Sequence, residues 1–271
     1  MWTRQPQAVR RFSNTVAALY GERYKVSVLT PDNVSVDEAL DVCIDAFVDE
    51  PASVHLEPNR LQRRKGWQQF VEHFKDECTR NGLSVVCVDA KNNNQVAATL
   101  LVRDFASPLP SLVCDCIERW KEPDFASETS CEYTFLGPLL EVLVDVDKKY
   151  LNYRHRQFDN GIISKEKIEP GTVVDLWMGG TKKEYRRQGL LSKCFDKTTE
   201  LARKKGYKVA IAECTGLYSS MTMLKLGAKP VAFTNYATFP VSDGSVGWFV
   251  DPPHTKLELF SLDLTKLESC L

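Results

Sequence analysis

A short basic segment precedes a predicted helix in the second half of the chain. Arg186, Arg187 and Gln188 come directly before Gly189, and an amphipathic run begins at Leu190. The first turn of a helix has unpaired backbone N–H groups at the positive end of its dipole, and a glycine there allows close approach to the backbone. Such an arrangement can bind an anion, most naturally a phosphate. Charge and one glycine are equally compatible with a solvated basic turn between two buried elements.

Two common phosphate motifs do not fit this segment. It is not a P-loop, because no Gly-Lys-Ser/Thr closes it, and it is not a dinucleotide fingerprint, because Gly189 is its only glycine.

The residues around this segment predict a strand, a helix and a second, parallel strand. Val173 to Met178 is an apolar run that we interpret as a strand, broken at Gly179 and Gly180. The helix begins near Gly189 with apolar residues on one face, and Gly206 suits the left-handed position after its end. A strand from Tyr207 through Ile211 follows. A crossover of this kind is usually right-handed.

The basic segment also resembles a known family signature. Arg186 to Leu191 is similar to the Arg/Gln-x-x-Gly-x-Gly/Ala signature of the GNAT N-acetyltransferase superfamily, with Leu191 in place of the last small residue. The resemblance implies that this segment wraps the pyrophosphate of acetyl-CoA. It also implies that the preceding strand separates from its parallel neighbour and that its free backbone holds the pantetheine arm and the thioester. The cofactor-binding residues implied are Gly179, Gly180, Thr181, Lys182, Lys183, Arg186, Arg187, Gln188, Gly189, Leu190, Leu191 and Ser219.

Two more segments resemble the arylalkylamine N-acetyltransferase-like branch of this superfamily, which is found in insects and other invertebrates. One is Thr-Gly-x-x-Ser at residues 215–219, ahead of a helix that ends at Gly227, where Ala228 replaces the family's Phe. The other is the stretch from Ala46 to Pro51, which looks like the branch's Phe-x-x-Asp-Glu-Pro, although only Val48 separates Phe47 from Asp49 here. The resemblance assigns Glu50 as general base.

The same resemblance implies that Ser219 protonates the leaving CoA thiolate. Many GNAT enzymes use a tyrosine at the position of Met223, which cannot donate a proton, so Tyr218 is the alternative acid. By residue type alone, a carboxylate before a proline, such as Glu50, is usually a surface charge at a helix end, and Ser219 could simply donate to a backbone carbonyl. If Glu50 is only a surface carboxylate, the base is to be sought among His155, Asp145 and Glu213.

Composition excludes several other classes. The chain has 271 residues, 43% hydrophobic and 26% charged, which is ordinary for a globular protein. A net charge of −1 gives no reason to expect a nucleic acid or a membrane as partner. No apolar run approaches the roughly 18 residues needed to cross a bilayer. We expect a cytoplasmic protein, with a mitochondrial one as the alternative, since Arg4, Arg10 and Arg11 precede the first acidic residue, Glu22.

Nine cysteines, an odd number, favour reduced thiols over a disulfide framework. Cys114, Cys116 and Cys131 lack the two-residue spacing of zinc sites and the four histidines are scattered, so we expect no metal.

The whole chain is expected to form one α+β domain, with a mixed, mainly antiparallel sheet flanked by helices and splayed central parallel strands. Residues 1–23 form an N-terminal extension with a basic helix at Gln7 to Tyr20, and residues 104–170 an insertion near the acceptor site. The other predicted strands are Tyr24 to Leu29, Leu83 to Asp89, Gln95 to Arg103, Lys229 to Tyr236 and Lys256 to Leu264, and the other helices are Leu40 to Phe47, Asn59 to Asn81 and Leu139 to Leu151.

These expectations together describe an acetyl-CoA-dependent transferase. The acetyl group would go to a primary amine of a small, arylalkylamine-like molecule by direct attack on the thioester. A non-catalytic acyl-CoA-binding GNAT protein and an acetyltransferase acting on protein, peptide or amino-acid amines are the alternatives. The sequence does not indicate an oligomeric state.

Overall fold

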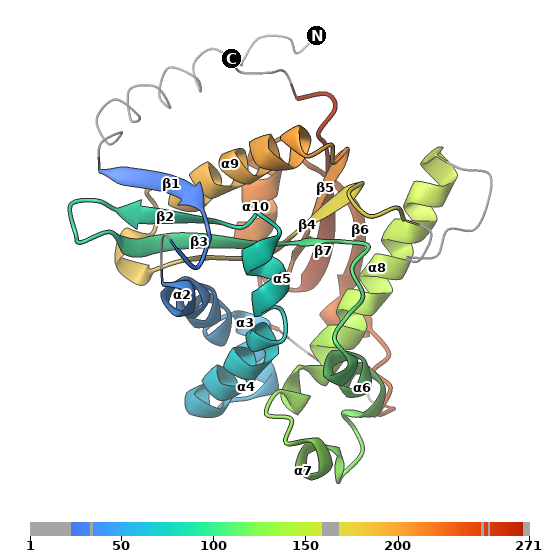
Figure 1. The fold of residues 1–271 in the computed structure, drawn as a ribbon. Helices are drawn as coiled ribbons and strands as arrows, with labels where there is room; N and C mark the ends of the chain where they lie inside the picture. The colour runs from blue at the N-terminus through green and yellow to red at the C-terminus, as the bar shows by residue number, and fades with distance from the viewer. Residues whose placement is uncertain (1–22, 33–34, 159–167, 245–246, 249, 268–271) are drawn as a thin grey trace.

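A computed structural model describes residues 23–32, 35–158, 168–244, 247–248 and 250–267, and the side chains of residues 155–158 are not described. The expected N-terminal helix at Gln7 to Tyr20 and Cys270 lie outside the described residues. Figure 1 shows a central sheet seen nearly edge-on with helices on both faces.

The sheet has seven strands in the order β1-β2-β3-β4-β5-β7-β6. Only the β4–β5 pair among these strands is parallel, so the sheet is mixed and mainly antiparallel, as the sequence predicts. The strands are β1 (Tyr24–Val28), β2 (Val85–Asp89), β3 (Gln95–Asp104), β4 (Val173–Thr181), β5 (Val209–Cys214), β6 (Lys229–Asn235) and β7 (Lys256–Asp263).

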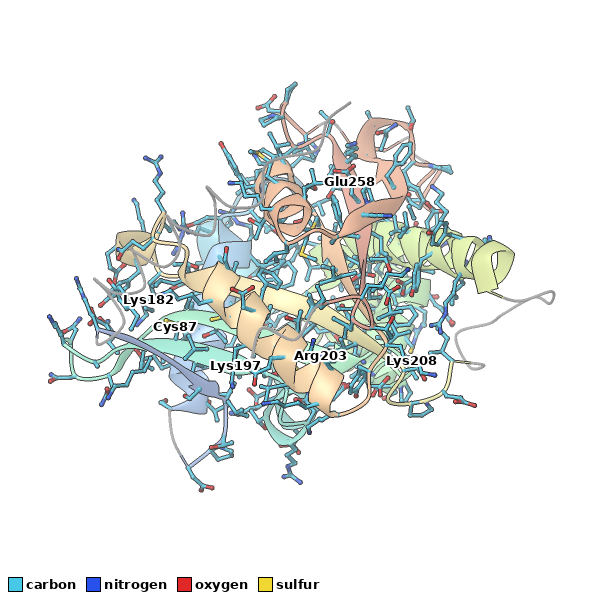
Figure 2. The ribbon with its side chains drawn as sticks, turned by 90° about the horizontal axis from the view of Figure 1, so that it is seen from above. Cys87, Lys182, Lys197, Arg203, Lys208 and Glu258 are labelled. Atoms are coloured by element: carbon cyan, nitrogen blue, oxygen red, sulfur yellow. The ribbon has the colours of Figure 1, made fainter. Side chains whose placement is uncertain are left out.

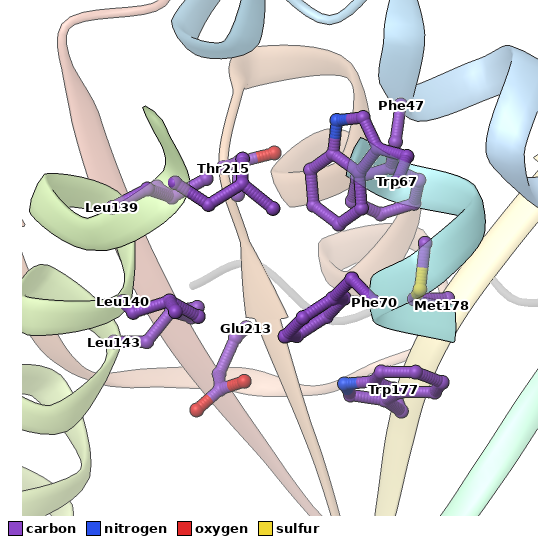
Figure 3. Close-up of a pocket in the computed structure, with 11 residues that line it drawn as sticks. Phe47, Trp67, Phe70, Leu139, Leu140, Leu143, Trp177, Met178, Glu213 and Thr215 are labelled. Carbon is purple, nitrogen blue, oxygen red and sulfur yellow. The ribbon is translucent and has the colours of Figure 1, made fainter. Parts of the chain in front are cut away.

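The two parallel strands pair over a short length. Val173 to Asp175 of β4 align with Val209 to Ile211 of β5, and beyond these pairs the strands separate. Figure 3 shows β4 and β5 spreading apart toward the ends at which Met178 and Thr215 lie. The expected splay of the central strands is therefore confirmed.

One face of the sheet is covered by α9 (Leu190–Lys204) and, near β5 to β7, by α10 (Leu217–Lys225). Figure 2, which views the molecule from above, shows α9 lying across the strands, with Lys197 and Arg203 on it. The apolar residues of α9 include Leu190, Cys194 and Phe195, which pack on strand residues such as Cys87 in one hydrophobic cluster. The segment β4-α9-β5 is thus the predicted strand, helix and parallel strand.

The opposite face carries the remaining helices (Figure 1). α2 packs on β3 and β4, and α8 packs on β6 and β7. Their apolar faces share a second cluster with α4, α5 and α6. These helices are α2 (Val36–Val48), α3 (Pro51–Leu56), α4 (Arg60–Glu72), α5 (Lys75–Arg80), α6 (Ser111–Arg119), α7 (Phe125–Thr129) and α8 (Gly137–Phe158), with short 3-10 helices at Thr134–Leu136, Lys183–Tyr185 and Tyr236–Thr238.

Three predicted boundaries are wrong. The helix expected from Asn59 to Asn81 is two helices, because the chain turns at His73 and Phe74. At this turn the Phe74 ring packs against Trp177, with ring centroids 4.4 Å apart. The helix expected at Leu139 to Leu151 is the longer α8. The segment 104–170 is therefore largely helical where it is described.

The third error concerns the glycine pair, where β4 was expected to break. The strand continues to Thr181, and Gly179 and Gly180 pair with Leu100 and Thr99 of β3. A Cβ on Gly180 would lie 2.4 Å from the carbonyl oxygen of Val42 in α2. The glycine thus serves close packing of α2 on the strand rather than a turn.

Candidate active site

The basic segment lies where β4 leads into α9. Gly189 takes the cap position of α9 with a left-handed φ of 70°, and Arg187 before it has a φ of 64°. Arg186 and Arg187 are exposed, and the first turn of α9 carries no acidic side chain. Gln188 is held from β1, because the Tyr24 hydroxyl donates to its Oε1 at 2.6 Å. The positive end of α9 is therefore open to solvent, with two guanidinium groups beside it.

Two of the predicted cofactor-binding residues, Lys182 and Leu191, make contacts that the sequence did not indicate. The Lys182 ammonium group is ion-paired with Glu38 of α2 at 2.8 Å, so its charge is already balanced. Leu191 lies over β4, since a Cβ on Gly179 would be 3.1 Å from its Cδ1. Leu191 fills space that a small residue would leave open at this position.

Glu50 lies at the start of α3, on the other face of the sheet. Its Oε2 accepts a hydrogen bond from the backbone N–H of Ser53 at 3.1 Å, and Pro51 occupies the first turn. Its Oε1 is buried without a hydrogen-bond partner among the described residues. Burial raises the pKa of this carboxyl from 4.5 to about 7, and the Ser53 N–H and the nearby Thr215 side chain act in the opposite direction. A carboxyl with such a pKa can exchange protons near neutral pH.

Thr215 and Tyr236, which sequence reasoning missed, complete the surroundings of Glu50. Thr215 follows β5 directly, and its carbonyl oxygen accepts a hydrogen bond from the buried Tyr236 hydroxyl at 2.9 Å. His254 holds the start of α10 in place, because its Nδ1 accepts a hydrogen bond from the backbone N–H of Leu217 at 3.3 Å. The Thr-Gly pair was recognised as a motif, but nothing in the sequence connected it to Glu50.

The candidate acids lie on α10. Ser219 is exposed, and its hydroxyl donates to the carbonyl oxygen of Gly216 at 2.8 Å. Tyr218 is exposed as well, and its ring lies 5.4 Å from that of His254. Met223 is buried in the hydrophobic cluster beneath α9 and α10. The structure thus leaves Ser219 and Tyr218 accessible at the same end of β5 as Thr215.

The other candidate bases differ in position. Asp145 is ion-paired with Lys149 at 2.6 Å and accepts a hydrogen bond from Thr234. The side chain of His155 lies outside the described residues. Glu213 faces a cavity between α4, α8 and the separating strands.

This cavity is largely aromatic and apolar. In Figure 3 the carboxylate of Glu213 lies between the leucines of α8 and the ring of Trp177 of β4. Thr215 lies at the end of the cavity where β4 and β5 are farthest apart. The lining residues are Phe47, Trp67, Phe70, Leu136, Leu139, Leu140, Leu143, Trp177, Met178, Glu213 and Thr215.

Solved structures share this arrangement over most of the chain. Arylalkylamine N-acetyltransferase 2 from Aedes aegypti superposes with a TM-score of 0.63 at 18% identity, covering 89% of this chain and 99% of its own. The chain has the GNAT fold. An agmatine N-acetyltransferase (TM-score 0.62, 12% identity) and a polyamine N-acetyltransferase from Drosophila melanogaster (0.58, 13%) align over the same 89% of this chain and 99% of their own. No family model and no curated protein sequence matches the chain.

The GNAT fold confirms the fold class expected from the three sequence motifs. Among the residues that the structure describes, no helix is long and apolar enough to cross a membrane, and no group of three or more His, Cys, Asp or Glu side chains is arranged to hold a metal ion. The eight described cysteines are free thiols, and only Cys114 among them is exposed.

Proposed function

We propose that the protein transfers the acetyl group of acetyl-CoA to a primary amine of a small molecule, with Glu50 as general base. The observation that carries the proposal is the buried Glu50 Oε1, which has no hydrogen-bond partner among the described residues. A buried acceptor of this kind is costly unless a ligand supplies a donor. An ammonium group is such a donor, and it must lose a proton before it can react.

Residues of this chain would bind acetyl-CoA along the separated end of β4 and at the start of α9. The backbone N–H groups at the start of α9 and the side chains of Arg186 and Arg187 suit the pyrophosphate. The edge of β4 that faces β5 beyond Asp175, including Gly179 to Thr181, suits the pantetheine arm. These features fit the co-substrate that the GNAT resemblance implies.

The chemistry balances as a direct transfer. The amine nitrogen attacks the thioester carbon, the new C–N bond forms, and the C–S bond breaks. Glu50 takes one proton from the ammonium group, which leaves the neutral amine that attacks. The second proton that the nitrogen loses as the amide forms replaces the proton that the hydroxyl of Ser219, or of Tyr218 as the alternative, gives to the thiolate. The products are the N-acetylated amine and CoA.

The neighbours support a small-molecule acceptor. Those with the TM-scores given above are named for arylalkylamines, agmatine and polyamines, and the lining of the cavity in this chain is mostly aromatic and apolar. A cavity lined in this way suits a small amine better than an exposed protein surface does.

The test is an acetylation screen on the purified protein. Acetyl-CoA is offered with arylalkylamines, diamines and polyamines, amino acids and peptides, and both CoA release and the acetylated product are measured. We expect turnover with small primary amines and its loss in Glu50→Gln, with Asp49→Asn, its exposed neighbour, as the matched control. Acetyl-CoA binding without any acetylated product would instead identify a non-catalytic acyl-CoA binder. Turnover restricted to peptides would identify a protein acetyltransferase.

A further inference from the structure

The segment that carries Glu50 is held by a helix that the proposed chemistry does not involve. Glu50 lies between α2, which ends at Val48, and α3, whose C-cap is Glu57. Helix α4 packs against both of these helices. It contacts them through Arg63 and Trp67, which are four positions apart and therefore lie on one side of α4.

Arg63 joins the C-terminal ends of α2 and α3. Its Nε donates a hydrogen bond to the carbonyl oxygen of Val48 at 2.7 Å, and its Nη1 donates to that of Glu57 at 2.5 Å. Carbonyl groups at the end of a helix lack partners within the helix and lie at the negative end of its dipole, so a cation suits both. One rigid guanidinium group thus fixes the two ends of the segment that contains Glu50.

The guanidinium group of Arg63 does not balance an acid. Arg63 is 4% exposed, and it forms no ion pair with any side chain that the structure describes. A buried cation without a carboxylate is costly. Here the cost is offset by backbone carbonyl groups on both sides of Glu50. The next residue, Arg64, differs, because it is ion-paired with Asp41 and Asp45 of α2.

Trp67 contacts the cap of Glu50 through Ser53. The indole Nε1–H donates a hydrogen bond to the Ser53 hydroxyl oxygen at 3.2 Å, and both side chains are buried. The backbone N–H of Ser53 in turn donates to Glu50 Oε2. Burial raises the pKa of Glu50, and both this N–H and the Ser53 side chain oppose the rise. Trp67 also lines the acceptor cavity, at the end where Thr215 lies (Figure 3).

We propose that Arg63 and Trp67 of α4 are positioning residues, which hold Glu50 where it can accept a proton from the acceptor. This inference rests on the proposed function and adds to it the residues that orient the base. Arg63 fixes the ends of the segment, and Trp67, through Ser53, fixes its middle. Neither residue exchanges a proton itself.

The first experiment removes the hydroxyl group between Trp67 and the base. In Ser53→Ala the Trp67 ring remains in the cavity, but Glu50 loses a group that stabilises its ionised form. The acceptor is the amine with the highest kcat/KM in the acetylation screen. We expect kcat to fall by roughly 10-fold, with KM and the Kd for acetyl-CoA within about 2-fold of the wild type. The acidic limb of kcat/KM should move to higher pH.

The matched control is Ser84→Ala. Ser84 is also buried, and its hydroxyl oxygen accepts a hydrogen bond from the backbone N–H of Val102 in β3 at 3.0 Å. This variant likewise leaves a buried donor unpaired, but Ser84 has no hydrogen bond to α3 or α4 in the described part of the chain. A loss of stability alone would therefore appear in both variants, whereas the acidic limb should shift only in Ser53→Ala.

The second experiment compares two adjacent arginines of α4. Arg63→Met keeps a long apolar stem and loses both donors, so kcat should fall by roughly 10–100-fold at unchanged affinity for acetyl-CoA. Arg63→Lys keeps the charge but cannot span two carbonyl groups as a guanidinium group does, so it should recover only part of kcat. Arg64→Met is the control, and its kcat should stay within about 2-fold of the wild type, since exposed ion pairs contribute little.

The outcomes separate this inference from the proposed function. An acidic limb in Ser53→Ala that coincides with that of the wild type would overturn the role of Trp67, and a kcat in Arg63→Met no lower than in Arg64→Met would overturn that of Arg63. Both results leave the acetyltransferase intact. If Arg63→Met does not fold, full kcat in Arg63→Lys counts against the inference. If no amine is acetylated, the proposed function is refuted, and an NMR titration of the Glu50 carboxyl that is unchanged in Ser53→Ala would refute the positioning as well.

Discussion

The backbone N–H of Ser53 donates a hydrogen bond to Glu50 Oε2 at 3.1 Å, while Glu50 Oε1 is buried with no partner in the described part of the chain. One oxygen thus caps α3 and fixes the carboxylate, and the other is left for a ligand. This division explains how a residue at a helix end can serve as a base, since the helix cap holds it in place.

Replacing Glu50 with Gln should abolish the pH dependence of the reaction at its acidic side. The carboxyl, whose pKa is raised to about 7 by burial, acts as base only when ionised, so kcat/KM should rise with pH through about 7. In Glu50→Gln we expect kcat/KM to fall by roughly 10²–10⁴-fold and the acidic limb to flatten, with acetyl-CoA binding unchanged. The measurement is kcat/KM at a series of pH values from about 5.5 to about 9. Near wild-type turnover with an intact acidic limb would show that Glu50 is not the base.

The same residue should make folding stability fall as pH rises. Its pKa is about 7 in the folded state against 4.5 ordinarily, so between these values the unfolded chain releases a proton that the folded chain keeps. Raising the pH through this window therefore favours unfolding. The loss of folding stability caused by Glu50 is complete above a pH of about 7. Glu50→Gln should be more stable than the wild type at pH 8, by at most about 3 kcal/mol, and equal at pH 4. Urea unfolding at both pH values measures this, and a variant less stable at pH 8 would contradict it.

Removing both guanidinium groups before α9 should weaken acetyl-CoA binding. In Arg186→Ala/Arg187→Ala we expect the Kd for acetyl-CoA to rise by roughly 10–100-fold, because charge-assisted contacts to the pyrophosphate are lost. Calorimetric titration gives the Kd, and an unchanged thermal unfolding curve shows that the fold is intact.

The control for this variant is Lys197→Ala/Lys204→Ala on the same helix. It removes the same charge from α9, but both lysines are ion-paired with Glu200 far from the helix start. Its Kd should stay within about 2-fold of the wild type, since exposed ion pairs contribute little. A similar rise in Kd for both variants would mean that only the total charge matters.

Ser219→Ala tests the proposed acid. If the Ser219 hydroxyl protonates the thiolate, kcat should fall by at least about 10²-fold, while KM for the amine changes little. The Ser219 hydroxyl donates a hydrogen bond to the Gly216 carbonyl oxygen, so it must turn toward the thiolate during the reaction. Tyr218→Phe is measured beside it. A loss confined to Tyr218→Phe would assign the acid role to Tyr218.

Gly180→Ala should destabilise the fold, because the new Cβ would lie 2.4 Å from the Val42 carbonyl oxygen. We expect a loss of about 1–3 kcal/mol in the free energy of unfolding, measured in urea. Gly171→Ala is the comparison, since its Cβ would meet no atom within 4 Å and only its φ of 80° is unfavourable. If Gly180→Ala costs no more than Gly171→Ala, close packing of α2 is not the reason for the glycine.

Local sequence was sufficient for the elements whose limits depend on backbone preferences. The start of α9 after Gly189, its end before Gly206, and the interruption at Glu50 and Pro51 all agree with prediction. Glycine, proline and amphipathic periodicity act over a few residues, so the helix limits that they set can be predicted from the sequence alone. The GNAT fold followed because three motifs stand in the order that this resemblance requires.

Tertiary structure decided what the residues of the site do. Lys182 stays a predicted cofactor-binding residue through its backbone, but its ammonium group pairs with Glu38, 144 positions away in the sequence, and no local pattern indicates that pair. The sequence presents Glu50 as a charge at a helix end, and only tertiary packing buries its carboxyl and thereby raises its pKa. Glu213 gained its place beside Phe70 and Trp177 from three separate elements. Burial, ion pairing and cavity shape depend on contacts between distant segments, and no local pattern encodes them.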